Sequence, residues 1–218
     1  MPEGMTFDEL NRLYDREHEG HMRSMPYDEY FGEMDLSEEQ IERRKQTARD
    51  IEEFTLFALL SLYYQIQIGA YDYSSVSSGM SSSYNALLER LGTEFTAAFR
   101  QQHVDLVVSE IINTTLQNMD DPYVYSEDRA RFIAENEANS VWNDAEYEDA
   151  LLTGKTRKRW SAILDKRTRD THREVNGVDI PISELFVVGD SLMAYPRDDA
   201  HGAGAEEIVN CRCSVIYY

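Results

Sequence analysis

The C-terminal stretch from Lys155 to Tyr218 constrains the fold of this chain more than any other part. It opens with a basic segment, residues 155–173, which contains Trp160 and eight of the 21 lysines and arginines of the chain. It ends with Cys211 and Cys213, the two cysteines of the protein. The pattern upstream is that of acidic helices, whereas within the stretch it changes to short strands and turns. The sequence therefore predicts two differently built regions.

Several residues of this stretch follow one another in a specific order. They are Trp160, Asp165, Arg167, Arg169, His172, Gly177, Phe186, Pro196, Asp198, Asn210, Cys211 and Cys213. Together they resemble the C-terminal domain of the phage Mu F-like head morphogenesis family, which comprises minor capsid proteins of tailed phages and prophages. Upstream, Glu137 matches the last residue of the family's Ala-Arg-Thr-Glu pattern, whereas Glu135 and Asn136 replace its Arg and Thr.

This resemblance implies a minor capsid or head morphogenesis protein of a tailed phage or prophage. Such a protein acts during procapsid assembly and contacts the portal or the inner shell. We therefore expect the portal protein and the capsid shell as partners. The expected location is inside the virion head near the portal, after assembly in the host cytoplasm. The alternative is an internal virion protein, stabilised by a metal ion, that binds packaged DNA or is ejected with it.

The charge distribution limits the partners of the chain. Its net charge is −20, and outside residues 155–173 acidic residues outnumber basic ones by 26. Nucleic-acid phosphates attract Lys and Arg, so the chain as a whole does not have the composition of a nucleic-acid-binding protein. The basic segment can meet an acidic partner or packaged DNA, or it can neutralise the chain's own acidic helices. Its candidate contacts are Lys155, Arg157, Lys158, Arg159, Lys166 and Arg173.

The chain divides by pattern into an N-terminal docking arm (residues 1–36), a long-helix region (37–125) and the Mu F-like domain (126–218). The predicted fold class is α+β, with a mainly α-helical N-terminal region followed by a small α+β domain with short antiparallel strands. The arm carries a capping-box pattern at residues 6–9 and several aromatic residues. This composition favours docking onto a surface, either of the same chain or of a partner.

A second capping box, Ser37 to Gln40, predicts a long helix over residues 38–68. No charged residue occurs from Phe54 to Tyr71. That length approaches a membrane span, but the polar residues within it favour a helix buried in a core or an oligomer interface. We therefore expect no membrane contact.

Three more segments follow in the helical region. The serine-rich residues 69–83 predict a loop. Apolar spacing predicts one helix over residues 84–117. A further helix is expected over residues 126–152, with Gly154 at its C-terminal cap.

The last region is expected to contain strands. Asn176-Gly177 predicts a tight turn between two short strands, and residues 211–217 alternate as a strand does. Because side chains two residues apart on a strand point to the same face, Cys211 and Cys213 would face the same way. Trp160 is expected to anchor the basic segment to the fold.

These side chains suggest a metal site. With Asp165 and His172, the two cysteines would supply two sulfur, one nitrogen and one oxygen donor, a set that zinc accepts. A disulfide between cysteines one residue apart would close a strained ring, which favours ligation or free thiols. The alternative is that Cys213 packs as a small apolar residue and His172 hydrogen-bonds to Asp165. The sequence leaves both open.

The same residues allow a catalytic interpretation. A cysteine could act as nucleophile with His172 as base and Asp165 as the orienting group, or His172 and Glu137 could form a nuclease-like site. However, the sequence shows neither a nucleophile elbow nor an oxyanion-hole motif. We therefore expect the chain not to be an enzyme.

Overall fold

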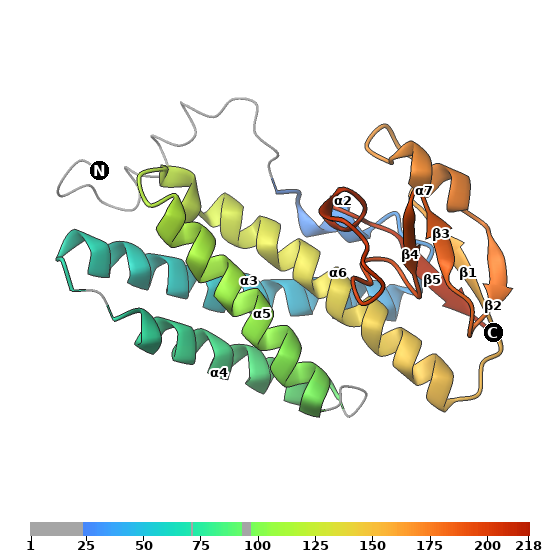
Figure 1. Cartoon of the computed structure of the whole chain (residues 1–218), viewed down its shortest axis with the longest axis horizontal. Helices are drawn as coiled ribbons and strands as arrows, with labels where there is room; N and C mark the ends of the chain where they lie inside the picture. The colour runs from blue at the N-terminus through green and yellow to red at the C-terminus, as the bar shows by residue number, and fades with distance from the viewer. Residues whose placement is uncertain (1–23, 71, 93–96) are drawn as a thin grey trace. The chain divides into compact units, whose positions relative to one another are not determined.

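The computed structural model describes residues 24–70, 72–92 and 97–218 (Figure 1). The chain forms two compact units. One comprises Thr47–Ala134 with the described residues before Pro26, and the other comprises Pro26–Gln46 with Glu135–Tyr218. These units divide the chain differently from the three sequence regions, because residues 26–46 belong with the C-terminal part.

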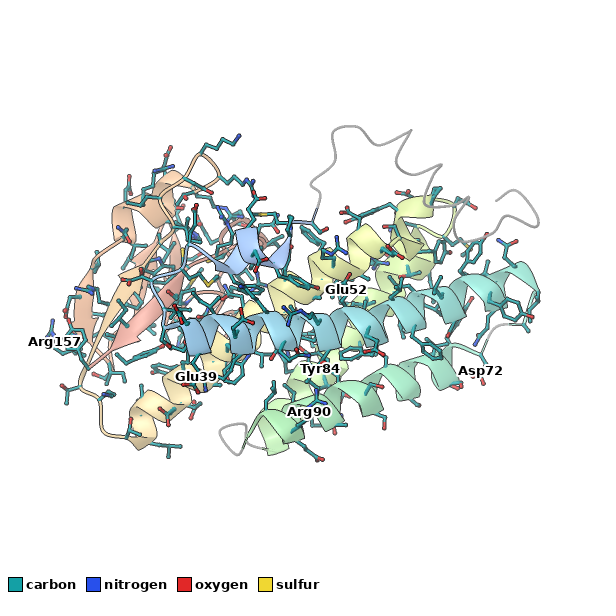
Figure 2. The ribbon with its side chains drawn as sticks, turned by 180° about the vertical axis from the view of Figure 1, so that it is seen from behind. Glu39, Glu52, Asp72, Tyr84, Arg90 and Arg157 are labelled. Carbon is teal, nitrogen blue, oxygen red and sulfur yellow. The ribbon has the colours of Figure 1, made fainter. Side chains whose placement is uncertain are left out.

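The first unit is built from helices. They are α3 (Glu38–Gln67), α4 (Tyr73–Leu91), α5 (Ala97–Gln117), the short 3-10 helix η1 (Pro122–Tyr125) and α6 (Glu127–Leu152). Helices α3 and α6 also continue into the second unit. Tyr84 and Arg90 on α4 lie towards α3 (Figure 2), where the Tyr84 ring packs at a tilt against Phe54 and Arg90 pairs with Asp50.

The ends of the long helices confirm the sequence prediction. Ser37 and Gln40 exchange the reciprocal hydrogen bonds of a capping box, and α3 begins at Glu38. The helix α6 ends at Leu152, and Gly154 follows with a φ of +74°, which glycine adopts without steric cost. No helix among the described residues is both long enough and apolar enough to cross a membrane.

The prediction for residues 69–117 was wrong in two places. The serine-rich segment is mostly helical, because Asp72 caps α4 by accepting a hydrogen bond from the Ser75 amide. Val76, Met80 and Tyr84 then bury one face of that helix, and this packing outweighs the weak helix preference of serine. The single helix expected over residues 84–117 is interrupted at Gly92, whose φ of +148° does not fit a helix.

The second unit contains small antiparallel sheets. Strands β2 (Asp179–Pro181), β1 (Arg157–Ser161) and β5 (Ser214–Tyr217) form one sheet in that order, and β3 (Phe186–Val188) pairs with β4 (Ser191–Met193). Short helices α7 (Asp170–Val175) and α8 (Ala205–Ile208) precede β2 and β5 (Figure 1). The expected α+β class, with a mostly helical N-terminal region and small antiparallel sheets near the C-terminus, is confirmed.

Two strand predictions need correction. Helix α7, and not a strand, precedes the turn at Asn176-Gly177. The turn therefore joins α7 to strand β2 instead of joining two strands. The last strand begins at Ser214, so Cys211 and Cys213 lie before it and not on it. The reason is that their backbone carbonyls bond to helix α6 instead of to a neighbouring strand.

The core of this unit is centred on Trp160, which is buried against Phe186 and Val215 and thus anchors the basic segment as expected. Residues 26–36 of the N-terminal arm also belong to this unit. Tyr30 and Phe31 of α2 (Tyr27–Phe31) are both buried. The arm therefore docks on its own chain over these residues, while the capping box at residues 6–9 lies outside the described residues.

Candidate functional site

A buried cluster of one imidazole and two thiols lies in the second unit. His172 projects from α7, and Cys211 and Cys213 come from the segment before β5; all three are buried. The Nδ1 atom of His172 lies 3.3 Å from the Cys213 Sγ and 3.6 Å from the Cys211 Sγ. These donor atoms all lie within 4.8 Å of one another, so the structure brings together three of the four predicted ligands.

The other side of the imidazole is held by Glu207. Its Oε2 lies 2.9 Å from Nε2 of His172 and accepts a hydrogen bond of 2.9 Å from the Thr171 hydroxyl. Trp160 stands edge-on to the imidazole, with ring centroids 5.9 Å apart. The ring is therefore fixed, with one nitrogen directed at a carboxylate and the other at two sulfur atoms.

Asp165 does not join this cluster, which corrects the prediction for that residue. Its carboxylate accepts a 2.6 Å hydrogen bond from Arg212 and a 2.8 Å bond from the Arg167 amide. Partial burial acts to raise its pKa, but these hydrogen bonds lower the pKa to about 2. The alternative contact between Asp165 and His172 is also replaced, since Glu207 occupies that position.

Helix α6 positions the cysteine segment through three buried asparagines. The Asn139 side chain donates to the Cys211 carbonyl at 2.9 Å, and the Asn143 side chain donates to the Cys213 carbonyl at 3.2 Å. Asn136 accepts from the amide of Asn210, a residue with a φ of +58°. Residues at i, i+3 and i+7 share one helix face, so α6 presents an amide ladder to this segment.

Arg44 of α3 binds the side-chain oxygens of two of these asparagines. Its guanidinium makes two 2.8 Å hydrogen bonds to Glu146 and a 3.2 Å bond to the Asn143 side-chain oxygen. It also contacts the Asn139 oxygen at 3.4 Å. Because both asparagine oxygens face Arg44, their amide nitrogens are free to donate to the cysteine carbonyls.

Sequence reasoning missed these supporting residues. The asparagines at positions 136, 139 and 143 do show helical spacing within an acidic helix, a signal that could have indicated a shared polar face. Glu207 gave no such signal, since its pairing with His172 depends on the tertiary fold.

The remaining motif residues mainly shape the backbone. Gly177 has a φ of +78° and donates to the Trp160 carbonyl at 2.9 Å. Asp198 accepts from the Ala194 amide at 2.6 Å, and the Pro196 carbonyl accepts from Asn143 at 3.3 Å. Glu137 is half-buried on α6, whereas its neighbours Glu135 and Asn136 are buried.

Most of the basic segment is engaged within its own unit. Arg157 pairs with Asp179 and Arg167 pairs with Glu29. Further contacts are Arg169 to the Val209 carbonyl and Arg173 to the Thr168 carbonyl. Lys155, Arg159 and Lys166 are exposed.

Lys158 is not a surface contact, which corrects the prediction for that residue. Its Nζ donates to the Ala194 carbonyl at 2.7 Å and lies over the rings of Tyr147 and Phe186. Burial lowers the pKa of Lys158 to about 8. The side chain is wholly buried and cannot reach a partner.

Burial and hydrogen bonds shift the pKa values of the three side chains in the cluster. Burial acts to raise the pKa of the Cys211 thiol, but hydrogen bonds from Cys213 and His172 hold it well below its ordinary value. The bond to Cys211 and burial both raise the pKa of Cys213. Burial lowers the pKa of His172, and the bond to Cys211 more than offsets this and raises it.

This arrangement can hold a metal ion through three donor atoms, or it can present a thiolate. A reactive thiolate needs access for its substrate. A partly open pocket beside the cluster has room for at least one water-sized molecule. The pocket can therefore accept a small ligand beside the two sulfur atoms and the imidazole.

Comparisons with known proteins point to one family. The model of the family described as phage Mu protein F like protein matches residues 107–216, half of the chain. Over 88 residues the chain is 38% identical to the NAD(+)–arginine ADP-ribosyltransferase EFV of Enterococcus faecalis strain ATCC 700802 / V583. Over 94 residues it is 34% identical to the minor head protein GP7 of Bacillus phage SPP1.

These matches cover parts of each protein. The first covers 38% of this chain and 18% of the transferase, and the second covers 41% of this chain and 29% of the minor head protein. The chain thus matches less than a third of the length of either relative. No solved structure matches the chain.

Proposed function

The chain belongs to the phage Mu protein F-like family of minor head proteins, and we propose that it acts in procapsid assembly by binding the portal or the inner capsid shell. The family match over residues 107–216 carries this proposal. It includes α6 and the whole cysteine–histidine cluster.

An exposed apolar stripe, formed by two residues of α3 and by Ile68 directly after it, supports a contact through the N-terminal helices. Phe57, Tyr64 and Ile68 are 74%, 65% and 56% exposed, respectively. Positions i, i+7 and i+11 fall on one side of a helix, so the three side chains share a face. The neighbouring Leu59 and Leu62 are buried. A helix with an apolar face on each side is suited to bind its own unit and a partner at once.

Affinity capture from cells that express the chain and the portal protein of the same phage tests this proposal. The wild-type chain should retain the portal or a shell component. A triple variant, Phe57→Ser with Tyr64→Ser and Ile68→Ser, should lose at least tenfold of the captured protein while folding normally. The double variant Leu151→Ser with Leu152→Ser, which changes exposed leucines at the end of α6, serves as the matched control.

The possible results distinguish a wrongly assigned contact surface from a wrongly proposed function. Capture that is equal for the triple variant and wild type would show that another surface makes the contact. Failure of the wild-type chain to retain any head component would contradict the proposed function itself.

The exposed side chains of Lys155, Arg159 and Lys166 favour a second candidate function, an internal virion protein that binds packaged DNA. Three phosphate contacts would give a fall in the logarithm of the binding constant of roughly 0.9 per contact for each tenfold rise in salt. This candidate requires salt-sensitive retention of the chain on DNA, and loss of retention when the three residues are changed to Gln. It ranks second because much of the basic segment is paired within its own unit.

We also propose that the role is structural and not enzymatic. The thiols of Cys211 and Cys213 and the imidazole of His172 are buried, which restricts the access of a substrate to them. The transferase activity in the name of one relative belongs to that protein, of which 18% is matched.

A further inference from the structure

The cysteine–histidine cluster has the composition and spacing of a zinc site. We propose that His172 Nδ1, Cys211 Sγ and Cys213 Sγ bind one zinc ion, with a water molecule as the fourth ligand. This inference goes beyond the head-assembly role and does not depend on which head component the chain contacts.

The distances between the donor atoms support this assignment. Zinc lies about 2.1 Å from an imidazole nitrogen and about 2.3 Å from a thiolate sulfur, so tetrahedral angles place nitrogen and sulfur about 3.6 Å apart. The structure has His172 Nδ1 at 3.6 Å from the Cys211 Sγ and at 3.3 Å from the Cys213 Sγ. The three donor atoms lie within 4.8 Å of one another, so small side-chain movements complete the geometry.

The outer contacts of the cluster are those of a metal-binding histidine. Such a histidine usually donates its second ring N–H to a carboxylate, which fixes the tautomer and makes the first nitrogen a better ligand. Glu207 takes this role, with its Oε2 2.9 Å from His172 Nε2 and a further 2.9 Å bond from the Thr171 hydroxyl. The acceptor nitrogen Nδ1 is then the one that faces both sulfur atoms.

The backbone that carries the thiols is also fixed in advance. The Cys211 and Cys213 carbonyls accept hydrogen bonds from Asn139 and Asn143 of α6, so the two sulfur atoms are held together without a bond between them. Both cysteines are free thiols. Two adjacent thiolates in a buried site are costly unless a cation neutralises them, and a divalent ion supplies the required charge.

The cavity provides the fourth position. Its volume of about 20 Å³ exceeds the space that one water molecule needs, and His172, Cys211 and Cys213 all line it. Three arginines also line it, but each bonds to another acceptor: Arg167 to Glu29, Arg169 to the Val209 carbonyl and Arg212 to Asp165. Sulfur and imidazole donors in this number favour zinc over the hard cations magnesium and calcium.

Metal analysis of the full-length chain tests the proposal. The chain is purified under reducing conditions, supplied with zinc and dialysed, and its metal content is measured by plasma mass spectrometry. We expect one zinc ion per chain. Replacement of zinc by cobalt(II) should give a thiolate-to-cobalt charge-transfer band and the intense visible bands of a tetrahedral site.

Variants identify the ligands. Cys213→Ser and His172→Gln should lower zinc affinity at least tenfold, whereas His201→Gln, which changes a partly exposed histidine, should retain it. Glu207→Gln should weaken zinc binding by about 10–100-fold without changing the stoichiometry. If a ligand variant fails to fold, the stoichiometry and cobalt spectrum of the wild-type chain still decide the question.

Three results would overturn the proposal. The first is a reduced wild-type chain that retains no zinc and gives no charge-transfer band with cobalt(II). The second is unchanged zinc binding in folded Cys213→Ser. The third is stoichiometric binding of iron in preference to zinc, since iron(II) is the weaker-binding ion at such donors.

Discussion

Replacing Arg44 with methionine should destabilise the second unit strongly. The Arg44 side chain is wholly buried, and its guanidinium makes two 2.8 Å hydrogen bonds to Glu146. It also bonds to the side-chain oxygens of Asn143 and Asn139, which in turn hold the cysteine segment. Methionine fills most of the same space but donates no hydrogen bond, so Asn143 and Asn139 lose this donor and Glu146 keeps the 3.0 Å hydrogen bond from Gln40.

The expected loss can be estimated from this geometry. Removing one partner of a buried ion pair costs about 3–5 kcal/mol, since the remaining charge stays desolvated. Glu146 keeps some access to water, with 13% of its side chain exposed, which places the loss near the lower end of that range. A loss of about 3 kcal/mol is a large part of the typical 5–15 kcal/mol stability of a folded domain.

Urea unfolding followed by tryptophan fluorescence measures this loss. Trp142 and Trp160 both lie in the second unit, so their emission reports on the unit that contains Arg44. With a slope of about 2 kcal/mol per molar urea, a loss of about 3 kcal/mol lowers the midpoint by about 1.5 M. Arg157→Met is the matched control, since it breaks an exposed ion pair with Asp179 in the same unit.

The control should lose less than about 1 kcal/mol, because exposed ion pairs contribute little. The double variant Arg44→Met with Glu146→Leu should recover part of the loss, since it removes the stranded carboxylate. A midpoint for Arg44→Met that equals that of Arg157→Met would refute the view that Arg44 organises this unit.

Two further predictions concern the same unit. Burial lowers the folded-state pKa of Lys158 to about 8, below the unfolded value of about 10.4. Between these two pH values, Lys158 is therefore protonated in the unfolded chain and largely neutral in the folded one. Wild-type stability should therefore rise relative to Lys158→Met by about 1 kcal/mol per pH unit from pH 8 to 9.5, as urea midpoints at each pH would show; a flat difference would contradict the assigned pKa. Phe31→Ala, in the docked arm, should cost about 3–5 kcal/mol in the same fluorescence assay, and a loss below about 1 kcal/mol would mean that the arm does not stabilise the unit.

The sequence correctly predicted the features that depend on interactions between neighbouring residues. The Ser37–Gln40 capping box sets the start of α3, and Gly154 follows the end of α6, because both depend on a few neighbouring backbone groups. The serine-rich start of α4 failed for the opposite reason. Its helical state comes from the burial of Val76, Met80 and Tyr84, which no local preference of serine reveals.

The candidate site was likewise predicted only in part from the sequence. His172, Cys211 and Cys213 stood out as uncommon residue types that can ligate or react, and the structure places them together. Asp165 was a plausible fourth donor by chemistry, but Arg212 binds its carboxylate, while Glu207 contacts His172. A sequence with many acidic residues does not show which one the fold directs inward.

Quantitative mass spectrometry of purified particles tests the central claim most directly. Empty procapsids and DNA-filled heads of the phage that encodes this chain would be compared with the lysate from which they were purified. The account predicts that the chain copurifies with procapsids, in fewer copies than the major shell protein. Absence of the chain from every purified particle, despite its presence in the lysate, would contradict a role as a minor head protein.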